Sequence, residues 1–332
     1  MKNRLIAVTL ILILALSCAV SDGQVIIAAG PDFTRLGFYK FNPASPLAKR
    51  IVKIPDSLLK YYSRMDGKRN YAAYSPSAPD KGLVLKYLAL LPPVYQSVLS
   101  ERCVGIYFVR NFMGNGLAGW VAGDAGRSYF YIVLNPDALK NSLSATLTQR
   151  EKSCFIIPGS GRTIRVDAGR KFKGLAYALF HEATHGVDYV KGVTHFTAPE
   201  LPKEYRTASP VAGRFFKQVW GAYAFPWRSE DHSLRKKITF YGLGGGPKIP
   251  IKSAPALYKW LLGSPFVSLY ATKSWAEDFA ELATFNMLTQ ELGQPYRIIL
   301  TAPGAEPAVF EPMRSPKVLS RAEKIMGVLE SF

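Results

Sequence analysis

Long apolar runs are almost absent from this sequence. Beyond the first 18 residues no apolar stretch reaches the ~20 residues that a membrane-spanning helix needs, so the mature chain is expected to have no transmembrane helix. Internal repeats and low-complexity tracts are absent as well. The sequence contains no recognised motif for reading nucleic acid, and we therefore do not expect a nucleic-acid partner.

Acidic residues are scarce, with 24 Asp and Glu against 42 Lys and Arg and a formal net charge of +18. The surplus is uneven, because residues 191–273 hold 13 Lys and Arg against 4 Asp and Glu. This long basic and aromatic insert fits recognition of an acidic protein or peptide, of an anionic wall polymer, or of lipid headgroups. The alternative is a solvated basic face with its own small core.

Cysteine occurs at only three positions, and the first of them lies in an N-terminal export segment, residues 1–18. Lys2 and Arg4 precede an apolar run that is too short for a comfortable membrane span. Residues 15–18, with the sequence ALSC, resemble a bacterial lipoprotein box imperfectly. We expect either lipid attachment at Cys18, which would anchor the exported protein to a membrane, or signal cleavage nearby and secretion.

The other two cysteines form an even pair once Cys18 is lipidated or removed. Cys103 and Cys154 would then lie in an oxidising compartment, and a disulfide between them would contribute roughly 4 kcal/mol in the chain-entropy model. Two separate buried thiols are the alternative.

The rest of the chain is rich enough in apolar residues, at 48%, to bury a sizeable core. Residues 19–80 are expected to form an N-terminal arm or small domain. From residue 81 the pattern becomes regular, with a helical stretch at 83–99 interrupted by two prolines, and then strands at 104–109, 116–122 and 129–134. Helix, small sheet and a further helix in this order indicate an α+β fold.

Two of the four histidines belong to the string His181-Glu182-Ala183-Thr184-His185, which follows the apolar run 174–180. On a helix, residues four apart share a face, so both imidazoles can hold one zinc ion. Glu182 would then lie beside the metal, placed to take a proton from a zinc-bound water. A surface helix that carries two histidines by chance is the alternative, but the flanking periodicity favours a buried active-site helix.

A catalytic zinc site needs a third protein ligand and one open position. His195 is a weak candidate, because Lys191 stands where the metzincin pattern would place a third histidine. Asp188, one turn past His185, is better placed to orient a ligand imidazole. Glu277 is the preferred ligand, because it shares one face of an otherwise apolar helix at 274–283 with Glu281.

These segments resemble the gluzincin metallopeptidases, in particular the catalytic domain of anthrax lethal factor and related bacterial peptidases. The resemblance is carried by the histidine string with Asp188 and by Tyr270, Glu277 and the Glu-x-Phe-Ala-Glu run that ends at Glu281. It implies a zincin-like fold over residues 81–332, with a small, mostly antiparallel sheet, an active-site helix that carries both histidines and a downstream glutamate helix.

The resemblance also implies a role for each matching residue. His181, His185 and Glu277 would bind one zinc ion per chain, and Glu182 would be the general base. Tyr270 would stabilise the oxyanion of the tetrahedral intermediate, and Glu281 would support the metal site. A tyrosine that merely lines the core or the cleft is the alternative for Tyr270.

Two functions are therefore compatible with the sequence. The first is an exported zinc metallopeptidase that hydrolyses peptide bonds in a protein or peptide substrate. The second is a non-catalytic, zinc-containing envelope lipoprotein that binds an anionic surface component through its basic insert. Glu182 favours the first, because a purely structural zinc site has no need of a general base and is usually closed by a fourth protein ligand.

Overall fold

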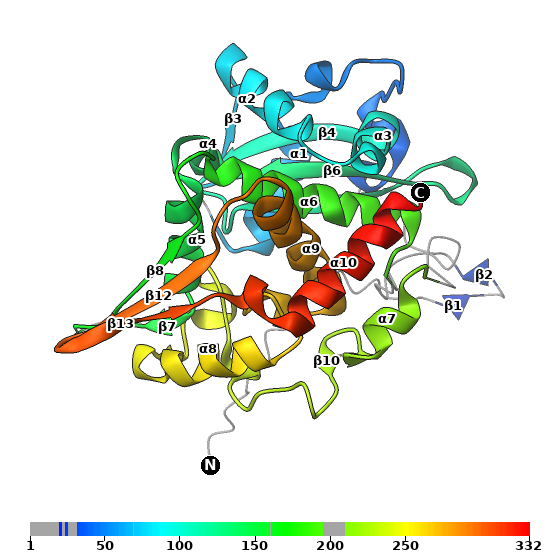
Figure 1. Cartoon of the computed structure of the whole chain (residues 1–332). Helices are drawn as coiled ribbons and strands as arrows, with labels where there is room; N and C mark the ends of the chain where they lie inside the picture. The colour runs from blue at the N-terminus through cyan, green and yellow to red at the C-terminus, as the bar shows by residue number, and fades with distance from the viewer. Residues whose placement is uncertain are drawn as a thin grey trace.

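A four-stranded sheet, with helices on one face and an N-terminal layer on the other, organises the upper half of the molecule (Figure 1). The computed structural model describes residues 20–21, 24–25, 32–68, 70–157, 159, 161–194 and 210–332. The predicted export segment, with Cys18, lies outside the described residues, and so does His195.

The sheet has the strand order β3-β4-β6-β5. Its strands are β3 (Ala72–Tyr74), β4 (Cys103–Arg110), β6 (Ser128–Leu134) and β5 (Gly116–Ala122). β3 pairs antiparallel with β4, and β5 pairs antiparallel with β6. From β4 the chain passes to the edge strand β5, reverses, and returns as β6 between β4 and β5. β4 and β6 are therefore parallel. The predicted α+β class is confirmed, and the sheet is mixed.

Alternation along β4 and β6 divides the apolar side chains between two cores. Ile106, Phe108 and Ile132 face the helices, while Tyr107 and Tyr131 face the N-terminal layer. This follows from strand geometry, in which successive side chains point to opposite faces. Both faces are buried, so the strands read as nearly continuous apolar runs rather than as alternating ones.

The N-terminal layer consists of α1 (Asp56–Met65) and three short 3₁₀ helices, η1 (Asp32–Thr34), η2 (Leu36–Tyr39) and η3 (Leu47–Arg50). Leu58 and Tyr62, one turn apart on α1, are buried against the sheet. The hydroxyl of Tyr62 lies 2.7 Å from that of Tyr131 on β6. Residues 32–80 thus share a core with the sheet.

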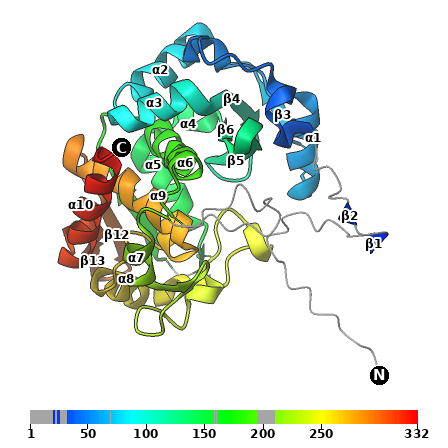
Figure 2. The same cartoon turned by 90° about the vertical axis from the view of Figure 1, so that its right-hand side faces the viewer.

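The other face of the sheet carries α2 (Ala78–Leu88), α3 (Pro93–Arg102), α4 (Asp137–Lys140) and the central α6 (Gly174–Lys191). Every residue of α6 from Gly174 to Asp188 is buried, and Figure 2 shows α6 in the middle of the molecule, between the sheet and α9 (Trp275–Asn286). Gly186 permits this packing, since a Cβ there would lie 2.2 Å from the ring of Phe130 on β6.

The lower half contains a second sheet of order β13-β12-β8, in which both pairings are antiparallel. Its strands are β8 (Thr163–Asp167), β12 (Arg297–Ala302) and β13 (Ala305–Phe310). The hairpin of β12 and β13 projects at the lower left of Figure 1. The helices of this half are α5 (Leu143–Lys152), α7 (Gly213–Lys217), α8 (Ala254–Gly263) and α10 (Pro316–Glu330).

Three pairs of two- or three-residue strands are the remaining described strands. They are β1 (Val20–Ser21) with β2 (Gln24–Val25), β7 (Phe155–Ile156) with β11 (Ile249–Pro250), and β9 (Trp220–Ala222) with β10 (Phe225–Pro226). Across the described ranges, no helix combines the length and apolar composition needed to cross a bilayer.

Candidate metal centre

Three side chains from two helices converge in the middle of the fold. Nε2 of His181 lies 3.2 Å from Nε2 of His185, and Oε2 of Glu277 lies 3.0 Å and 3.5 Å from these two nitrogens. Both histidines are buried, whereas the side chain of Glu277 is 24% exposed. Within the described residues these three form a group that could hold a metal ion. The group is open to solvent on the side of Glu277, the partly exposed member.

The spacing of the three atoms fits an ion. Ligand atoms 2.0–2.2 Å from a tetrahedral zinc lie roughly 3.3–3.6 Å apart. The observed sides of 3.0, 3.2 and 3.5 Å are within about 0.3 Å of that range, and they admit a point about 2 Å from all three atoms. Two ring nitrogens that face each other cannot both donate, so at least one lone pair is directed toward this point. Two imidazoles and a carboxylate are also a ligand set that zinc accepts.

Local structure explains the positions of the ligands. His181 and His185 are one turn apart on α6, so their side chains leave the same face. Glu277 is in the first turn of α9, where the hydroxyl of Ser274 accepts a hydrogen bond from the Glu277 backbone amide. This cap fixes the start of the helix, and the helix N-terminus favours a carboxylate there.

The charges of the centre support one another. Burial acts to lower the pKa of His181, but the contacts of its ring with the carboxylates of Glu277 and Glu281 outweigh it and raise the pKa to about 10. Burial acts to raise the pKa of Glu277, but the interactions with His185 and His181 hold it well below its ordinary value. Without a metal, the centre therefore holds a protonated His181 against an ionised Glu277.

Glu182 lies beside the three ligands, and its carboxylate interacts electrostatically with His181, His185 and Glu277. It is buried at the edge strand β5, where the backbone amide of Ala118 donates to it. Burial, reinforced by the charge of Glu277, raises the pKa of Glu182 above its ordinary value. A carboxylate with a raised pKa is better matched to proton transfer near neutral pH than an ordinary one.

A glycine on β5 makes room for Glu182. A Cβ at Gly116 would lie 2.9 Å from Cγ and 3.1 Å from Oε1 of Glu182. The absence of a side chain at this position is therefore a condition for the placement of the carboxylate.

Tyr270 also lies beside His181, in the short 3₁₀ helix η9 (Tyr270–Thr272). Its ring centroid is 5.7 Å from that of His181 and 4.9 Å from that of Phe240. Burial, followed by the negative charge of Glu277, raises the pKa of Tyr270 well above its ordinary value. The hydroxyl therefore stays protonated and can act only as a neutral donor or acceptor at this centre.

The two residues expected to support the ligands have different partners. Glu281 lies one turn after Glu277 on α9, and its Oε1 is 3.0 Å from Nδ1 of His181. Asp188 instead accepts hydrogen bonds from the backbone amide and the hydroxyl of Thr194, at 2.6 Å and 2.5 Å. Its contribution to His185 is electrostatic.

The structure adds residues that the sequence analysis did not single out. Tyr177 and Tyr189 flank the histidine pair at four-residue spacing on α6, so helical periodicity could have identified both. Tyr177 donates a 2.6 Å hydrogen bond to Glu281, and the ring of Tyr189 stacks against His185. Arg150, which binds Glu281 at 2.8 Å, carries no such signal.

The predicted disulfide between Cys103 and Cys154 is wrong. Both cysteines are free and buried in the structure. Each thiol is held locally, with Cys103 directed to the carbonyl of Gly105 and Cys154 to that of Arg150. Burial raises the pKa of Cys103 to about 12 and raises that of Cys154 as well. The alternative of two separate buried thiols is the observed one.

The described part of the basic insert packs around α9. Trp220 is buried and donates a 2.9 Å hydrogen bond to Asp278. The carbonyl of Tyr223 accepts a hydrogen bond from the amide of Trp275, and their rings meet edge-on at 5.5 Å. The insert thus forms a wall beside the start of the helix that carries Glu277.

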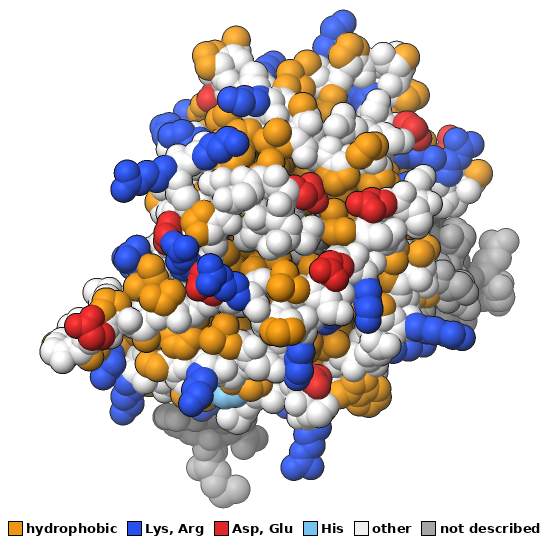
Figure 3. Space-filling view, in the orientation of Figure 1, with side chains coloured by type: hydrophobic (Ala, Val, Ile, Leu, Met, Phe, Trp, Pro, Cys, Tyr) orange, Lys and Arg blue, Asp and Glu red, His pale blue; other side chains and the backbone are white. Residues whose placement is uncertain are grey.

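Basic side chains are not confined to this wall. Figure 3 shows Lys and Arg distributed around the whole of the visible face, over the lower sheet as well as near α7 and β10. The positive charge is therefore a property of the surface at large on this side.

Comparison of the chain with protein-family models, with curated proteins and with solved structures gives no significant match.

Proposed function

We propose that this chain is a zinc-dependent metallopeptidase that hydrolyses peptide bonds. The proposal depends on one observation. The ligand atoms of His181, His185 and Glu277 lie close enough together to bind one ion, and Glu182 lies beside them. A zinc ion bound there would polarise a scissile carbonyl and lower the pKa of a water molecule toward about 7. An open fourth position is what distinguishes such a catalytic site from a structural one.

The chain's own residues have separable tasks in this reaction. Glu182 accepts a proton from the attacking water at its carboxylate and passes it to the leaving amine. Tyr270 keeps its hydroxyl proton and donates it in a hydrogen bond to the oxygen that becomes negative in the transition state. The burial of both groups supports these roles, because electrostatic interactions are stronger where water is excluded.

The edge strand supports a peptide as the substrate. β5 is the last strand of its sheet, and in the described residues the only backbone pairing on its outer side is a single bridge between Arg35 and Ala122. At Ala118 the amide donates a hydrogen bond to Glu182 and the carbonyl accepts one from Tyr189, so a peptide would pair with the positions beside it. An extended peptide can add to such an edge by backbone hydrogen bonds. Because Glu182 contacts β5, a peptide held there would lie next to the metal centre.

The first experiment compares the mature chain, residues 19–332, with its Glu182→Gln variant. Each protein is loaded with one equivalent of zinc and incubated with an unstructured protein such as casein. We expect wild type to cleave it and Glu182→Gln to lose at least ~10²-fold in rate while it retains zinc, because only the proton acceptor has been removed. Glu306→Gln, an exposed position on β13, is the matched control and should keep full activity.

Two outcomes would contradict the proposal. Wild type without bound zinc would remove the metal centre altogether. Zinc retention without cleavage of casein or of a broad peptide library would instead favour the non-catalytic, anion-binding alternative.

A further inference from the structure

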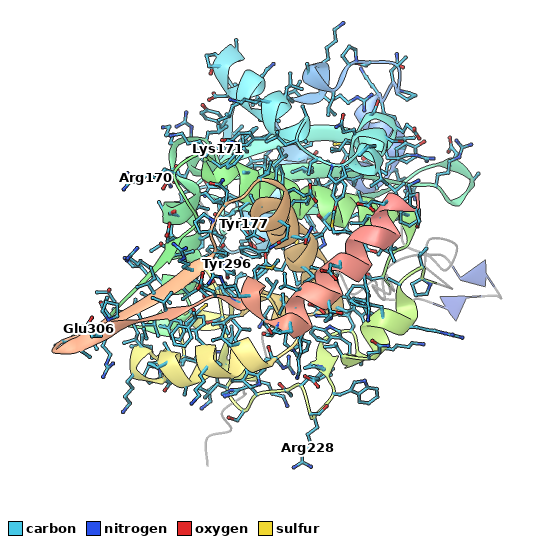
Figure 4. The ribbon with its side chains drawn as sticks, viewed as in Figure 1. Arg170, Lys171, Tyr177, Arg228, Tyr296 and Glu306 are labelled. Carbon is cyan, nitrogen blue, oxygen red and sulfur yellow. The ribbon has the colours of Figure 1, made fainter. Side chains whose placement is uncertain are left out.

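A buried polar cluster lies directly behind His181, on the side away from the proposed ion. At its centre is Arg150 on α5, whose side chain is 0% exposed. Its other members are Glu151, Tyr177, Tyr258, Ser268, Glu281 and Tyr296. Figure 4 shows Tyr177 and Tyr296 in the interior, whereas Arg170, Lys171, Arg228 and Glu306 lie at the periphery.

All five N–H groups of Arg150 have a partner. Nε and Nη2 donate to Oε1 of Glu151 at 3.1 Å and 2.9 Å, and Nη2 also donates to the hydroxyl of Tyr296 at 3.3 Å. Nη1 donates to the hydroxyl of Tyr177 at 2.6 Å and to Oε2 of Glu281 at 2.8 Å. A planar guanidinium with every donor used has one orientation only.

Both oxygens of the Glu281 carboxylate also accept hydrogen bonds. Oε2 accepts from Arg150 and from the hydroxyl of Ser268, and Oε1 accepts from the hydroxyl of Tyr177. Arg150 therefore holds one oxygen of Glu281 directly and the other through Tyr177. The same Oε1 also lies 3.0 Å from Nδ1 of His181.

The contact between Oε1 and Nδ1 is off the line of an ideal hydrogen bond, and Nδ1 has no better partner among the described residues. Once an ion has displaced the proton from Nε2, this contact is the one that keeps the remaining hydrogen of the His181 ring on Nδ1. A hydrogen on Nδ1 leaves the lone pair of Nε2 free to point at His185 and Glu277.

We propose that Arg150 is a positioning residue for the metal centre. It fixes the orientation of the Glu281 carboxylate, which in turn sets the ring orientation and tautomer of His181, so that Nε2 is presented to the ion. The inference rests on the proposed metal site and concerns a residue that lies two side chains away from it. Arg150 also supplies the positive charge that offsets two fully buried carboxylates, Glu151 and Glu281.

The test is a zinc titration of metal-free protein against a chromophoric chelator. We expect Glu281→Gln to weaken zinc binding 10- to 100-fold, and Arg150→Met to weaken it at least ~10-fold. If Arg150 acts through Glu281, the double variant should bind zinc about as tightly as Glu281→Gln alone, because the two effects share one path.

Arg321→Met is the matched control. Arg321 is also a buried arginine that binds a carboxylate of α9, since it pairs with Asp278 at 2.6 Å, but that pair does not lead to His181. It should lower the melting temperature of the metal-free protein, as Arg150→Met does, and leave zinc affinity within about 2-fold of wild type. The contrast separates a loss of positioning from a loss of stability.

If Arg150→Met fails to fold, Tyr177→Phe replaces it in the test. It preserves the ring and removes only the hydroxyl that joins Arg150 to Oε1 of Glu281. We expect a several-fold loss of zinc affinity, and again no further loss when Glu281→Gln is added.

The outcomes are distinguishable. Wild type without zinc would overturn the proposed function together with this inference. Zinc in wild type, with an unchanged affinity in the folded Arg150 or Tyr177 variant or with losses that multiply in the double variant, would overturn this inference alone.

Discussion

Nε2 of His181 faces Nε2 of His185 at 3.2 Å, and no more than one of the two nitrogens can carry a hydrogen in that contact. The carboxylate of Glu277 closes the group from a second helix. A metal-free protein has to keep a proton between these buried atoms, on His181, to hold the group together. The same arrangement is favourable for a protein that binds a cation at this point.

Removal of the third ligand should remove the ion. We expect about one zinc per chain in wild type and a marked loss in Glu277→Ala, because two imidazoles alone leave the ion without its only anionic ligand in the group. Elemental analysis of dialysed protein measures this. Equal zinc in both proteins would exclude Glu277 and return the search to Asp188 or His195.

Zinc affinity should rise with pH. The pKa of His181 is raised to about 10 by Glu277 and Glu281, so zinc has to displace a proton from its ring at neutral pH. Between pH 6.5 and 9 we expect up to about a tenfold gain in apparent affinity per pH unit, measured by chelator competition. A flat profile would contradict the protonated state of His181.

The stability of the metal-free protein should change in the opposite direction. A raised folded-state pKa contributes stability that is fully present below the ordinary pKa of His, about 6.5, and is lost as the pH rises through about 10. Thermal melting in the presence of a chelator, at pH values from 6 to 10, should therefore show a falling midpoint. His181→Gln should remove most of this slope.

Loss of the Tyr270 hydroxyl should slow catalysis without releasing zinc. For Tyr270→Phe we expect a fall in kcat of about 10²–10³-fold, because the ring still packs between His181 and Phe240 and only the donor is gone. Tyr74→Phe, a variant remote from the centre, should keep full activity. An unchanged kcat for Tyr270→Phe would leave Tyr270 as a packing residue.

A methyl group on α6 should destabilise the fold. Gly186→Ala places a Cβ 2.2 Å from the ring of Phe130, and overpacking of this kind costs about 1–3 kcal/mol. Gly82→Ala is the control, because nothing lies within 4 Å of its new Cβ on α2, and a helical alanine there should stabilise by up to ~1 kcal/mol. Urea denaturation measures the free energy of unfolding of both variants and of wild type. A Gly186→Ala variant as stable as wild type would contradict the close approach of α6 to β6.

Local patterns predicted much of this structure. The strand at 116–122 was predicted with its observed limits, and the helices that carry His181 and Glu277 lie where apolar periodicity placed them. These elements are long or regular enough for period and capping to identify them. By contrast, β3 is three residues long and lies in a stretch whose composition favours a loop, so only its pairing with β4 makes it a strand.

Partnerships between distant residues could not be predicted in this way. Arg150 and Glu281 are 131 positions apart, and neither is marked by its neighbours as half of an ion pair. Counting cysteines gave the wrong answer for a related reason. An even number permits a disulfide, but only the fold decides whether two thiols meet, and here each is held beside its own strand or helix.

The distribution of the ligands between α6 and α9 has a mechanical consequence. His181 and Glu277 are 96 positions apart, so an ion between them would act as a cross-link that closes a long loop, and such clips restrict the unfolded chain in the same manner as a disulfide. The chain that lacks its expected disulfide would thus have a reversible substitute for one. A chelator would then remove this cross-link from the core without breaking any covalent bond of the polypeptide.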